Sequence, residues 1–486
     1  MIYDYVVVGS SFSALGCIAG LIKSKKKILC IDGSEDELDD PGHKEMEFSE
    51  QNIPIKKFSF KQKSKKYFKP IEVLESYSFG GLSNVWGASA LRYIKEDFHD
   101  WPISYDSLEK YYEECEKIMN VSHYNDDLSK ELNIKENIHN DNKLNLYSNF
   151  IKSFLSNKHI NNKYTIGYSR VALDPKCYKC MECSFGCSDN YIFNTRNYLL
   201  KLIKNNDIEY KKNLILQKFI SKNDLIELKF KNSNNVEIYA KKLFIGAGSL
   251  HTSRIIINSL DKKKDLNLKE SQVFFIPAIY TGSVSDNENG HHTLAQAQFL
   301  FKKNIKYNIG KISYQIKYDP KLTISLLKKQ FGIFYKFIPR FLINKIFLIA
   351  GFINSDHSTY SGKIRKEDLG VDVIENKSNK KKIKFEILNQ LKILEKNHKF
   401  TSVRPFLKLG DFGISYHLGA SIPMINNEQN FKLKNNDLYC KKNGEISNFK
   451  NIFIIDSTNF TNIPSGSISL TSMANALRIA TENLND

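Results

Sequence analysis

The chain has 486 residues, of which 41% are hydrophobic and 12% aromatic. This length exceeds what one hydrophobic core usually fills, so we expect two interleaved domains. Lysine and arginine outnumber aspartate and glutamate by 71 to 53, which leaves a net charge of +18. Because these cations are spread along the whole chain, the composition argues against a nucleic-acid-binding protein and is typical of a codon bias toward Lys, Asn and Ile.

The N-terminus is not that of a signal peptide, because a strand-like run begins at Tyr3 with no basic segment before it. We therefore expect a cytoplasmic protein. The most apolar stretch, 331–354, contains Lys336, Pro339, Arg340 and Lys345 and is not expected to span a bilayer. Its mixture of aromatic and basic residues suits peripheral contact with a membrane; the alternatives are a buried helix and an oligomer contact.

A strand, turn and helix open the chain, with the sequence Y-D-Y-V-V-V-G-S-S-F-S-A-L-G at 3–16. A dinucleotide-binding turn needs a glycine for the sharp bend, a second small residue beside the pyrophosphate and a third for helix packing. Gly9, Ser11 and Ala14 occupy these places, and Asp32 ends the next strand, where an acid binds a ribose hydroxyl. The pattern predicts a dinucleotide site that also includes the neighbouring Phe12 and Gly33.

The middle of the chain alternates polar segments with strand-like runs. Residues 34–70 are polar and predict an excursion, and 125–146 predict a loop or weak helix. Short alternating runs over 208–248 predict a β-meander that returns to the cofactor domain. Further alternating runs predict an antiparallel sheet with one solvated face, and they are V-F-F-I-P-A-I-Y (273–280), T-L-A-Q-A-Q-F-L-F (293–301), K-I-S-Y-Q-I-K-Y (311–318) and K-K-I-K-F-E-I (381–387).

The C-terminal block, 451–480, predicts a buried strand ending at Asp456, then a loop and an amphipathic helix. Together with the opening turn, it indicates a cofactor domain that the chain leaves and re-enters.

Four segments resemble the glucose–methanol–choline (GMC) family of flavoprotein oxidoreductases. They are S-F-G-G-L-S-N-V-W-G-A-S-A-L-R (78–92) with the helix after Trp101, I-G-A-G-S-L-H-T-S-R (245–254), G-I-S-Y-H-L-G-A-S-I-P-M (413–424) and the C-terminal block. The resemblance implies bound FAD, with contacts from Gly80, Gly81, Ser83, Asn84, Gly87, Ala247, Gly248, Asp456 and Leu470. The tetrapeptide S-N-V-W is similar to the pyranose-oxidising branch, but Val85 replaces the histidine that tethers flavin there, so noncovalent FAD is expected.

The resemblance also implies a catalytic base at His417, whose ordinary pKa suits acceptance of an alcohol proton. The family's second catalytic histidine or asparagine is matched by Ser467, which can hold a substrate oxygen but is a poor proton carrier. Either Asn462 serves instead or the substrate differs in kind. The helix beginning near Ser469 would stabilise negative charge on reduced flavin through its N-terminus.

A cysteine cluster, Cys177, Cys180, Cys183 and Cys187, has the C-x2-C-x2-C-x3-C spacing of ferredoxin-type ligands. The fourth cysteine of that pattern often binds another cluster, and the usual following proline is Ser188. An iron–sulfur centre, thiols packed near the flavin, zinc and a disulfide all remain open, although a disulfide is disfavoured in a cytoplasmic protein.

We therefore predict an α/β fold in which a Rossmann-type FAD-binding domain with a central parallel sheet is interleaved with a substrate domain built on an antiparallel sheet. The expected segments are 1–120 (FAD domain), 121–165 (polar excursion), 166–262 (cysteine cluster and FAD domain), 263–405 (substrate domain) and 406–486 (FAD domain with the catalytic motif).

The predicted activity is oxidation of a CH–OH group, of a sugar or polyol, by a dehydrogenase rather than an oxidase, with an electron acceptor that the sequence does not identify. The alternative is a flavin and iron–sulfur protein that passes electrons to a membrane or carrier partner.

Overall fold

The computed structural model describes residues 1–35, 59–60, 71–72, 76–134, 148–156, 163–187, 189–222, 224–233, 235–283, 290–301, 312–425 and 438–484. Most of the polar stretch 34–70 lies outside the described residues, apart from 34–35 and strand β3 (Ser59–Phe60), which pairs with β4 (Ile71–Glu72). Of the second polar stretch, the described part contains one short helix, α3 (Asp127–Glu131), and 135–146 lie outside it.

The first sheet brings the two ends of the chain together. Its strands are β1 (Ile2–Val8), β2 (Ile28–Ile31), β6 (Glu209–Lys211), β7 (Leu216–Lys222), β8 (Leu225–Phe230), β9 (Ile238–Ile245) and β20 (Ile452–Ile454). The order is β6-β2-β1-β9-β8-β7, and β20 also pairs with β9. Pairing is parallel from β6 to β9 and for β20, and β7, β8 and β9 form an antiparallel meander. The predicted meander is confirmed.

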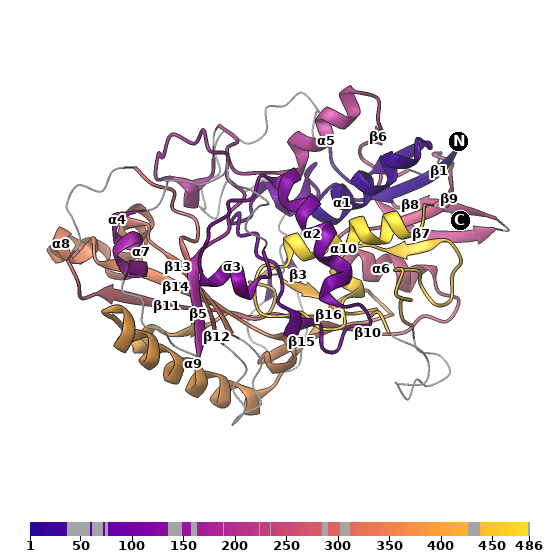
Figure 1. Cartoon of the computed structure of the whole chain (residues 1–486). Coiled ribbons are helices and arrows are strands. Elements are labelled where there is room, and N and C mark those ends of the chain that lie inside the picture. Colours follow the sequence, from indigo (N-terminus) through magenta and orange to yellow (C-terminus); the bar gives the residue numbers. More distant parts are fainter. Residues whose placement is uncertain are drawn as a thin grey trace.

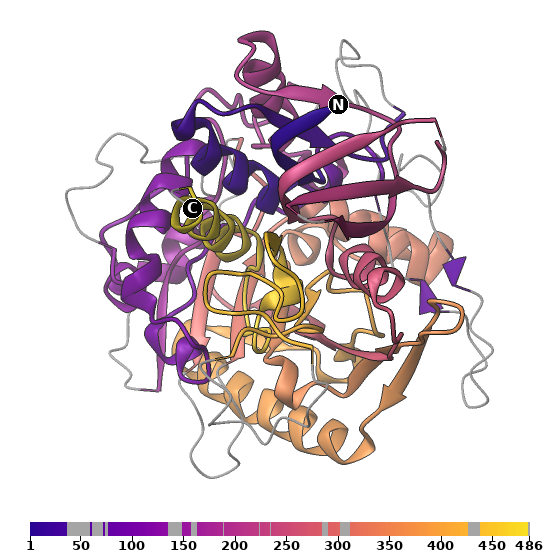
Figure 2. The ribbon, with the colours of Figure 1, turned by 90° about the vertical axis from the view of Figure 1, so that its right-hand side faces the viewer.

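Two helices from opposite ends of the sequence pack against each other on this sheet. α1 (Phe12–Leu21) is wholly buried, and α10 (Ser469–Glu482) lies beside it, as Figures 1 and 2 show. The approach is so close that a Cβ on Gly16 would lie 2.2 Å from the carbonyl oxygen of Met473. Flanking helices are α2 (Tyr105–Met119), α5 (Thr195–Lys204) and α6 (Ser249–Ser259).

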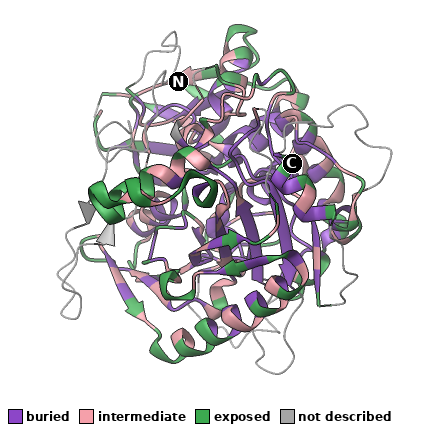
Figure 3. Ribbon diagram, turned by 90° about the vertical axis from the view of Figure 1, so that its left-hand side faces the viewer, coloured by how far each residue is buried: buried purple, intermediate pink, exposed green. Residues whose placement is uncertain are grey.

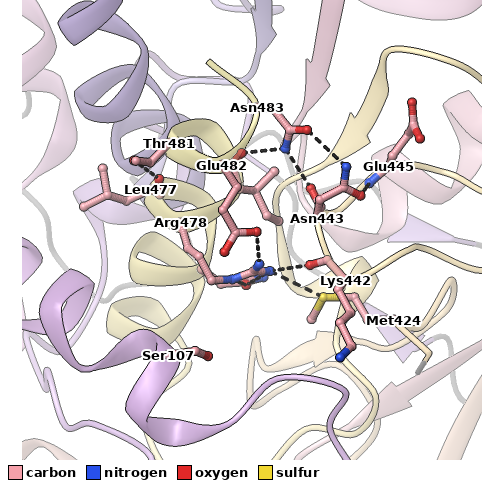
Figure 4. A network of polar contacts seen from close by, with 12 residues as sticks. Ser107, Met424, Lys442, Asn443, Glu445, Leu477, Arg478, Thr481, Glu482 and Asn483 are labelled. Carbon is pink, nitrogen blue, oxygen red and sulfur yellow. Dashed lines mark hydrogen bonds and ion pairs between the residues drawn. The ribbon is translucent and has the colours of Figure 1, made fainter. Parts of the chain in front are cut away.

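A buried arginine joins α10 to the loop before β20 (Figure 4). The Arg478 guanidinium donates to Asn475 Oδ1, to Glu482 Oε2 at 2.6 Å and to the carbonyl of Lys442 at 2.8 Å. Its side chain is only 1% exposed, so these acceptors replace the water that the cation loses on burial. The last helix and the loop around Lys442 are therefore held as one unit.

The second large sheet is antiparallel and has the order β17-β11-β14-β13-β12-β5, with β18 beside β11. Its strands are β5 (Tyr164–Tyr168), β11 (Val273–Tyr280), β12 (Ala297–Phe301), β13 (Ile312–Lys317), β14 (Ile346–Ile353), β17 (Phe400–Ser402) and β18 (Lys408–Leu409). Three of the four predicted strand runs are confirmed as β11, β12 and β13.

The fourth run, 381–387, was predicted to be a strand and is part of a helix, α9 (Lys377–His398). Ile383, Ile387, Leu391 and Leu394 are buried at helical spacing and pack in the same core as the antiparallel sheet. The alternation of Ile383, Phe385 and Ile387 was misleading because Phe385 points to solvent and is 51% exposed. In Figure 1, α9 runs along the lower edge of the molecule.

The apolar stretch 331–354 combines two kinds of structure. Its second half is β14, a central strand of the antiparallel sheet, where the sequence had indicated a helix or an interfacial segment. Its first half completes a helical connection made of α7 (Pro320–Phe331), the 3₁₀ segment η5 (Gly332–Phe337) and α8 (Arg340–Ile343). Among the residues that the structure describes, no helix combines the length and the apolar character needed to cross a membrane.

A smaller antiparallel sheet, with the order β16-β15-β10-β19, was not expected. It consists of β10 (Leu266–Glu270), β15 (Tyr360–Ile364), β16 (Val371–Glu375) and β19 (Leu418–Gly419). The remaining described α-helix, α4 (Asn149–Ser156), packs against the hydrophobic core of the large antiparallel sheet, which we call the second core. With a parallel core sheet and a large antiparallel sheet, the predicted fold class is confirmed.

Candidate functional site

A cavity of about 590 Å³ is lined by the first turn, by the segment after β9 and by α6. The segment around His417, the start of α10 and strands β11, β13 and β14 complete the lining. It therefore lies where the parallel strands end and where the antiparallel sheet faces them. Ligands of α/β folds bind at such carboxyl ends of parallel strands. The predicted residues that line it are Gly9, Ser11, Phe12, Asp32, Gly33, Gly81, Gly87, Ala247, Gly248, His417, Asp456 and Ser467.

The first turn requires glycine at position 9. Gly9 has φ +104°, and a Cβ there would lie 2.4 Å from the carbonyl oxygen of Gly246. The turn can therefore approach the segment after β9 only without a side chain. Ser11 is the N-cap of α1, so the unpaired N–H groups of this helix begin beside the cavity, where they favour an anion.

Asp32 lies at the end of β2, as predicted, and lines the cavity. Its Oδ1 accepts hydrogen bonds from the Tyr210 hydroxyl at 2.7 Å and from the Ser34 backbone N–H at 3.0 Å. Burial and the nearby carboxylate raise the pKa of Tyr210. The phenol therefore stays protonated and orients the Asp32 carboxylate.

The glycine-rich segment docks on the first turn through hydroxyl groups. The Gly80 N–H donates to Ser10 Oγ at 2.8 Å, and the Ser83 hydroxyl donates to the Gly80 carbonyl at 2.7 Å. Thr195 donates to the Ser10 carbonyl at 2.7 Å and contacts Ser83. Gly81 lines the cavity directly, and the hydrogen bonds of Gly80 and Ser83 fix its backbone against the first turn.

Five predicted cofactor contacts do not line the cavity: Ala14, Gly80, Ser83, Asn84 and Leu470. Asn84 donates to the carbonyl of Phe79 at 3.0 Å and so closes its own turn. Ala14 and Leu470 are fully buried in α1 and α10. In this structure these residues support the cavity wall.

Asp456 ends β20 beside the first turn of α6. Its Oδ2 accepts from the Thr252 hydroxyl at 2.6 Å, and its Oδ1 accepts from the Thr458 N–H at 2.9 Å. Burial raises the pKa of this carboxyl. The C-terminal strand is thereby joined to the segment that follows β9.

His417 lies on the segment that leads into β19 and lines the cavity. Its ring stacks on Phe352 with the centroids 4.7 Å apart, and its Nδ1 has no hydrogen-bond partner among the described residues. Burial lowers the pKa of His417 to about 4. The imidazole is therefore neutral at physiological pH and able to accept a proton.

Glu270, at the end of β10, holds the turn before His417. Its Oε1 accepts from the Gly413 N–H at 3.0 Å, the Ser415 N–H at 3.3 Å and the Ser415 hydroxyl at 2.6 Å. The next residue, Ser271, donates its N–H to the His417 carbonyl. Burial raises the pKa of Glu270 to about 7. The sequence offered no signal for this role, because Glu270 is more than 140 positions from the turn it binds.

Ser467 belongs to a chain of polar side chains that reaches the antiparallel sheet. Its hydroxyl donates to Ser89 Oγ at 2.9 Å, which also accepts from Gln315 Nε2 at 3.0 Å. Asn462, the alternative to Ser467, does not line the cavity; its amide bonds to Trp101 and Asp356 instead. Ser467 therefore lines the cavity with two polar side chains behind it.

The antiparallel sheet supplies a wall that sequence reasoning missed. Its cavity-facing residues are Val273, Phe275, Gln315, Lys317, Leu348, Ala350 and Phe352. Gln315 and Lys317 are two apart on β13, so they share a face, and Lys317 is paired in register with Leu348. Lys317 makes no ion pair with the described residues, and burial lowers its pKa. Two polar residues inside an apolar strand were the only available sequence signal.

The four clustered cysteines do not line the cavity, and all are free thiols. Within the described part of the chain, no three His, Cys, Asp or Glu side chains converge as metal ligands would. Burial raises the pKa of Cys183 to about 11 and raises that of Cys177, which favours the thiol over the metal-binding thiolate. The cysteines as placed do not fit an iron–sulfur cluster.

No family model and no curated protein matches the sequence. Solved structures do match it, 650 chains in number, so the fold alone does not single out one activity. Pyridoxine 4-oxidase from Mesorbium loti aligns with a TM-score of 0.63 over 99% of this chain and 99% of its own, at 11% sequence identity. The protein therefore shares the fold of that oxidase along its whole length.

Proposed function

We propose that the protein is an FAD-dependent oxidoreductase that oxidises a CH–OH group, of a sugar or polyol, as a dehydrogenase rather than an oxidase. The observation that carries this proposal is the single cavity that joins the dinucleotide-type turn at Gly9 to His417. The shared fold with pyridoxine 4-oxidase supports FAD-dependent oxidation of a CH–OH group, as does the resemblance of four segments to the GMC family.

The residues present fit FAD. Gly9 lines the cavity beside the N-terminus of α1, where a pyrophosphate would lie, and Asp32 lines it where it would bind a ribose hydroxyl. The start of α10 also lines the cavity, and its N-terminal N–H groups would stabilise negative charge. Val85 lines the cavity as well and cannot form a covalent link, so the cofactor would be noncovalent. Bound FAD would supply the hydride acceptor.

His417 would accept the substrate hydroxyl proton. Its burial keeps the imidazole neutral, and the stacked Phe352 together with the turn held by Glu270 fixes the plane of the ring. Ser467, backed by Ser89 and Gln315, would orient the substrate oxygen. The serine would not take over the proton, so one base, not two, serves the reaction.

The sheet wall indicates a substrate that is partly apolar and carries a negative group. Val273, Phe275 and Leu348 give the wall apolar surface. Lys317 is partly buried and forms no ion pair with the described residues; burial lowers its pKa, and the nearby Asp319 charge opposes that shift. An anionic group on the substrate would further offset the desolvation of this cation. Leu348 is four residues from Phe352 on β14, which places Lys317 about 13 Å along the sheet from the ring that stacks on His417. A sugar acid or sugar phosphate would supply the negative group.

The test is the cofactor content and substrate range of the purified full-length chain. We expect acid precipitation to release intact FAD. With an artificial dye as electron acceptor, the enzyme should oxidise carboxylated or phosphorylated polyols faster than their neutral counterparts, and it should consume little oxygen. A Lys317→Met variant should lose this preference and keep its flavin. Protein that contains no flavin and takes up no added FAD would overturn the proposal, and a flavoprotein that prefers neutral polyols would overturn the anionic substrate alone.

A further inference from the structure

The connection between β13 and β14, residues 320–345, exposes an unusual amount of apolar surface. The described part of the chain has 16 exposed large hydrophobic residues, and seven of them lie in this connection, with exposed fractions from 38% to 80%. The seven are Leu326, Phe331, Ile333, Phe334, Phe337, Phe341 and Leu342. Scattered single residues of this kind are normal on a soluble protein, but a contiguous group marks an interaction surface.

These helices do not bury an apolar face in the protein itself. Thr323 is the one buried residue in α7, η5 has none, and α8 has only Ile343. An amphipathic helix on a globular protein normally turns its apolar side to its own core. Figure 1 places α7 and α8 at one end of the molecule, and Figure 3, which faces that end, shows exposed helical ribbon there.

Every charged residue in this connection is basic. Lys328, Lys329, Lys336, Arg340 and Lys345 form no ion pair with the described residues, Lys321 pairs with Glu182, and no Asp or Glu occurs between 320 and 345. Aromatic side chains interleaved with unpaired cations match a lipid surface, where rings enter the headgroup region and cations pair with anionic lipids. A second copy of this chain would bring the same cations face to face.

We propose that the exposed side chains of 326–342, the membrane patch, dock the protein on the surface of a bilayer that contains anionic lipid. The patch lies peripherally, in the plane of the headgroups. Because it joins β13 to β14, it is adjacent in sequence to Lys317 and Leu348, which line the cavity. The proposal does not depend on the chemistry assigned to the cavity.

The test is co-sedimentation of the full-length protein with vesicles. Wild-type protein should sediment with phosphatidylcholine–phosphatidylglycerol vesicles more than with phosphatidylcholine alone. Binding should weaken when salt rises from about 0.1 M to about 1 M, which shortens the Debye length from roughly 10 Å to roughly 3 Å. Phe334→Ser with Phe337→Ser should weaken binding at least roughly tenfold, because two rings no longer enter the lipid. Lys328→Glu with Lys329→Glu should abolish the preference for anionic vesicles.

Matched controls come from other exposed sites. Phe406→Ser removes an exposed ring elsewhere, and Lys381→Glu with Lys382→Glu reverses two charges on the solvent face of α9; both should bind vesicles like wild type. Wild-type protein that stays in the supernatant, or patch variants that bind like the controls, would overturn the proposal. So would a wild-type dimer in light scattering that dissociates in the Phe334→Ser, Phe337→Ser variant while vesicle binding is unchanged.

Discussion

His417 shows how burial alters the pH range over which one imidazole is neutral. The ring is neutral because desolvation lowers its pKa to about 4, well below the ordinary value near 6.5. A base must be unprotonated to accept the substrate proton. In the proposed role of base, His417 would therefore stay competent across the physiological pH range and lose this competence only as the pH falls toward 4.

We expect His417→Ala to slow substrate-driven reduction of the flavin by at least roughly a hundredfold. FAD content should be unchanged. Stopped-flow measurement from pH 8 to pH 4 should give a wild-type rate that stays level and then falls near pH 4, and this acidic limb should vanish in the variant. Ser467→Ala should slow this step less, since the proposed role of its hydroxyl is to orient the substrate and not to carry the proton.

The control is His99→Ala, which removes an exposed histidine whose side chain is 86% exposed. It should reduce flavin at the wild-type rate. If His417→Ala also did so, with an unchanged pH profile, the assignment of the base would be wrong.

Single buried polar groups join secondary-structure elements to turns and loops that are remote in sequence. Glu270 links β10 to the turn before His417 through three hydrogen bonds, and Arg478 links α10 to the loop before β20. Each of these polar groups has lost its hydrating water on burial, and its hydrogen-bond partners offset the free-energy cost of that loss. The geometry of the cavity thus depends on contacts between elements that are remote in sequence.

Glu270 should make stability depend on pH. Its pKa is about 7 in the fold and 4.5 as a free side chain, so the folded state binds more protons between these values. Stability should therefore fall as the pH rises from 5 to 8, by up to about 3 kcal/mol from this group. Glu270→Gln, which keeps the acceptor oxygen, should remove that decline in urea unfolding measured at both pH values.

Glu114→Gln provides the comparison, because Glu114 forms an exposed ion pair with Lys23 and should leave the pH dependence as in wild type. A Glu270→Gln variant with the wild-type decline would show that Glu270 is ionised without penalty in the fold.

The molecule as a whole is assembled around the cavity from both ends of the chain. Gly9 and Asp456 are more than 400 residues apart and line the same space. A ligand that contacts both segments binds only the folded state, so it should stabilise the entire cofactor-binding region.

Removal of FAD should lower the thermal unfolding temperature. Each tenfold increase in free FAD above the dissociation constant should add about 1.4 kcal/mol to the unfolding free energy. Differential scanning calorimetry of flavin-free and reconstituted protein measures this. His417→Ala should respond as wild type does, and identical transitions with and without FAD would contradict binding across both segments.

Several features of this protein were determined by its sequence alone. The opening strand and turn, the small residues at 9, 11 and 14, the meander over 208–248 and the C-terminal strand and helix follow from local periodicity and turn chemistry. Such patterns are readable because the backbone of each segment constrains its own residues.

Only the tertiary structure decided the rest. The run 381–387 alternates like a strand, yet it became helical because Ile383, Ile387, Leu391 and Leu394 together reach the second core. Glu270, Gln315 and Lys317 gained their places at the site because strands remote in sequence pair beside the cavity. The physical reason is that burial, which sets both packing and pKa, depends on neighbours supplied by distant parts of the chain.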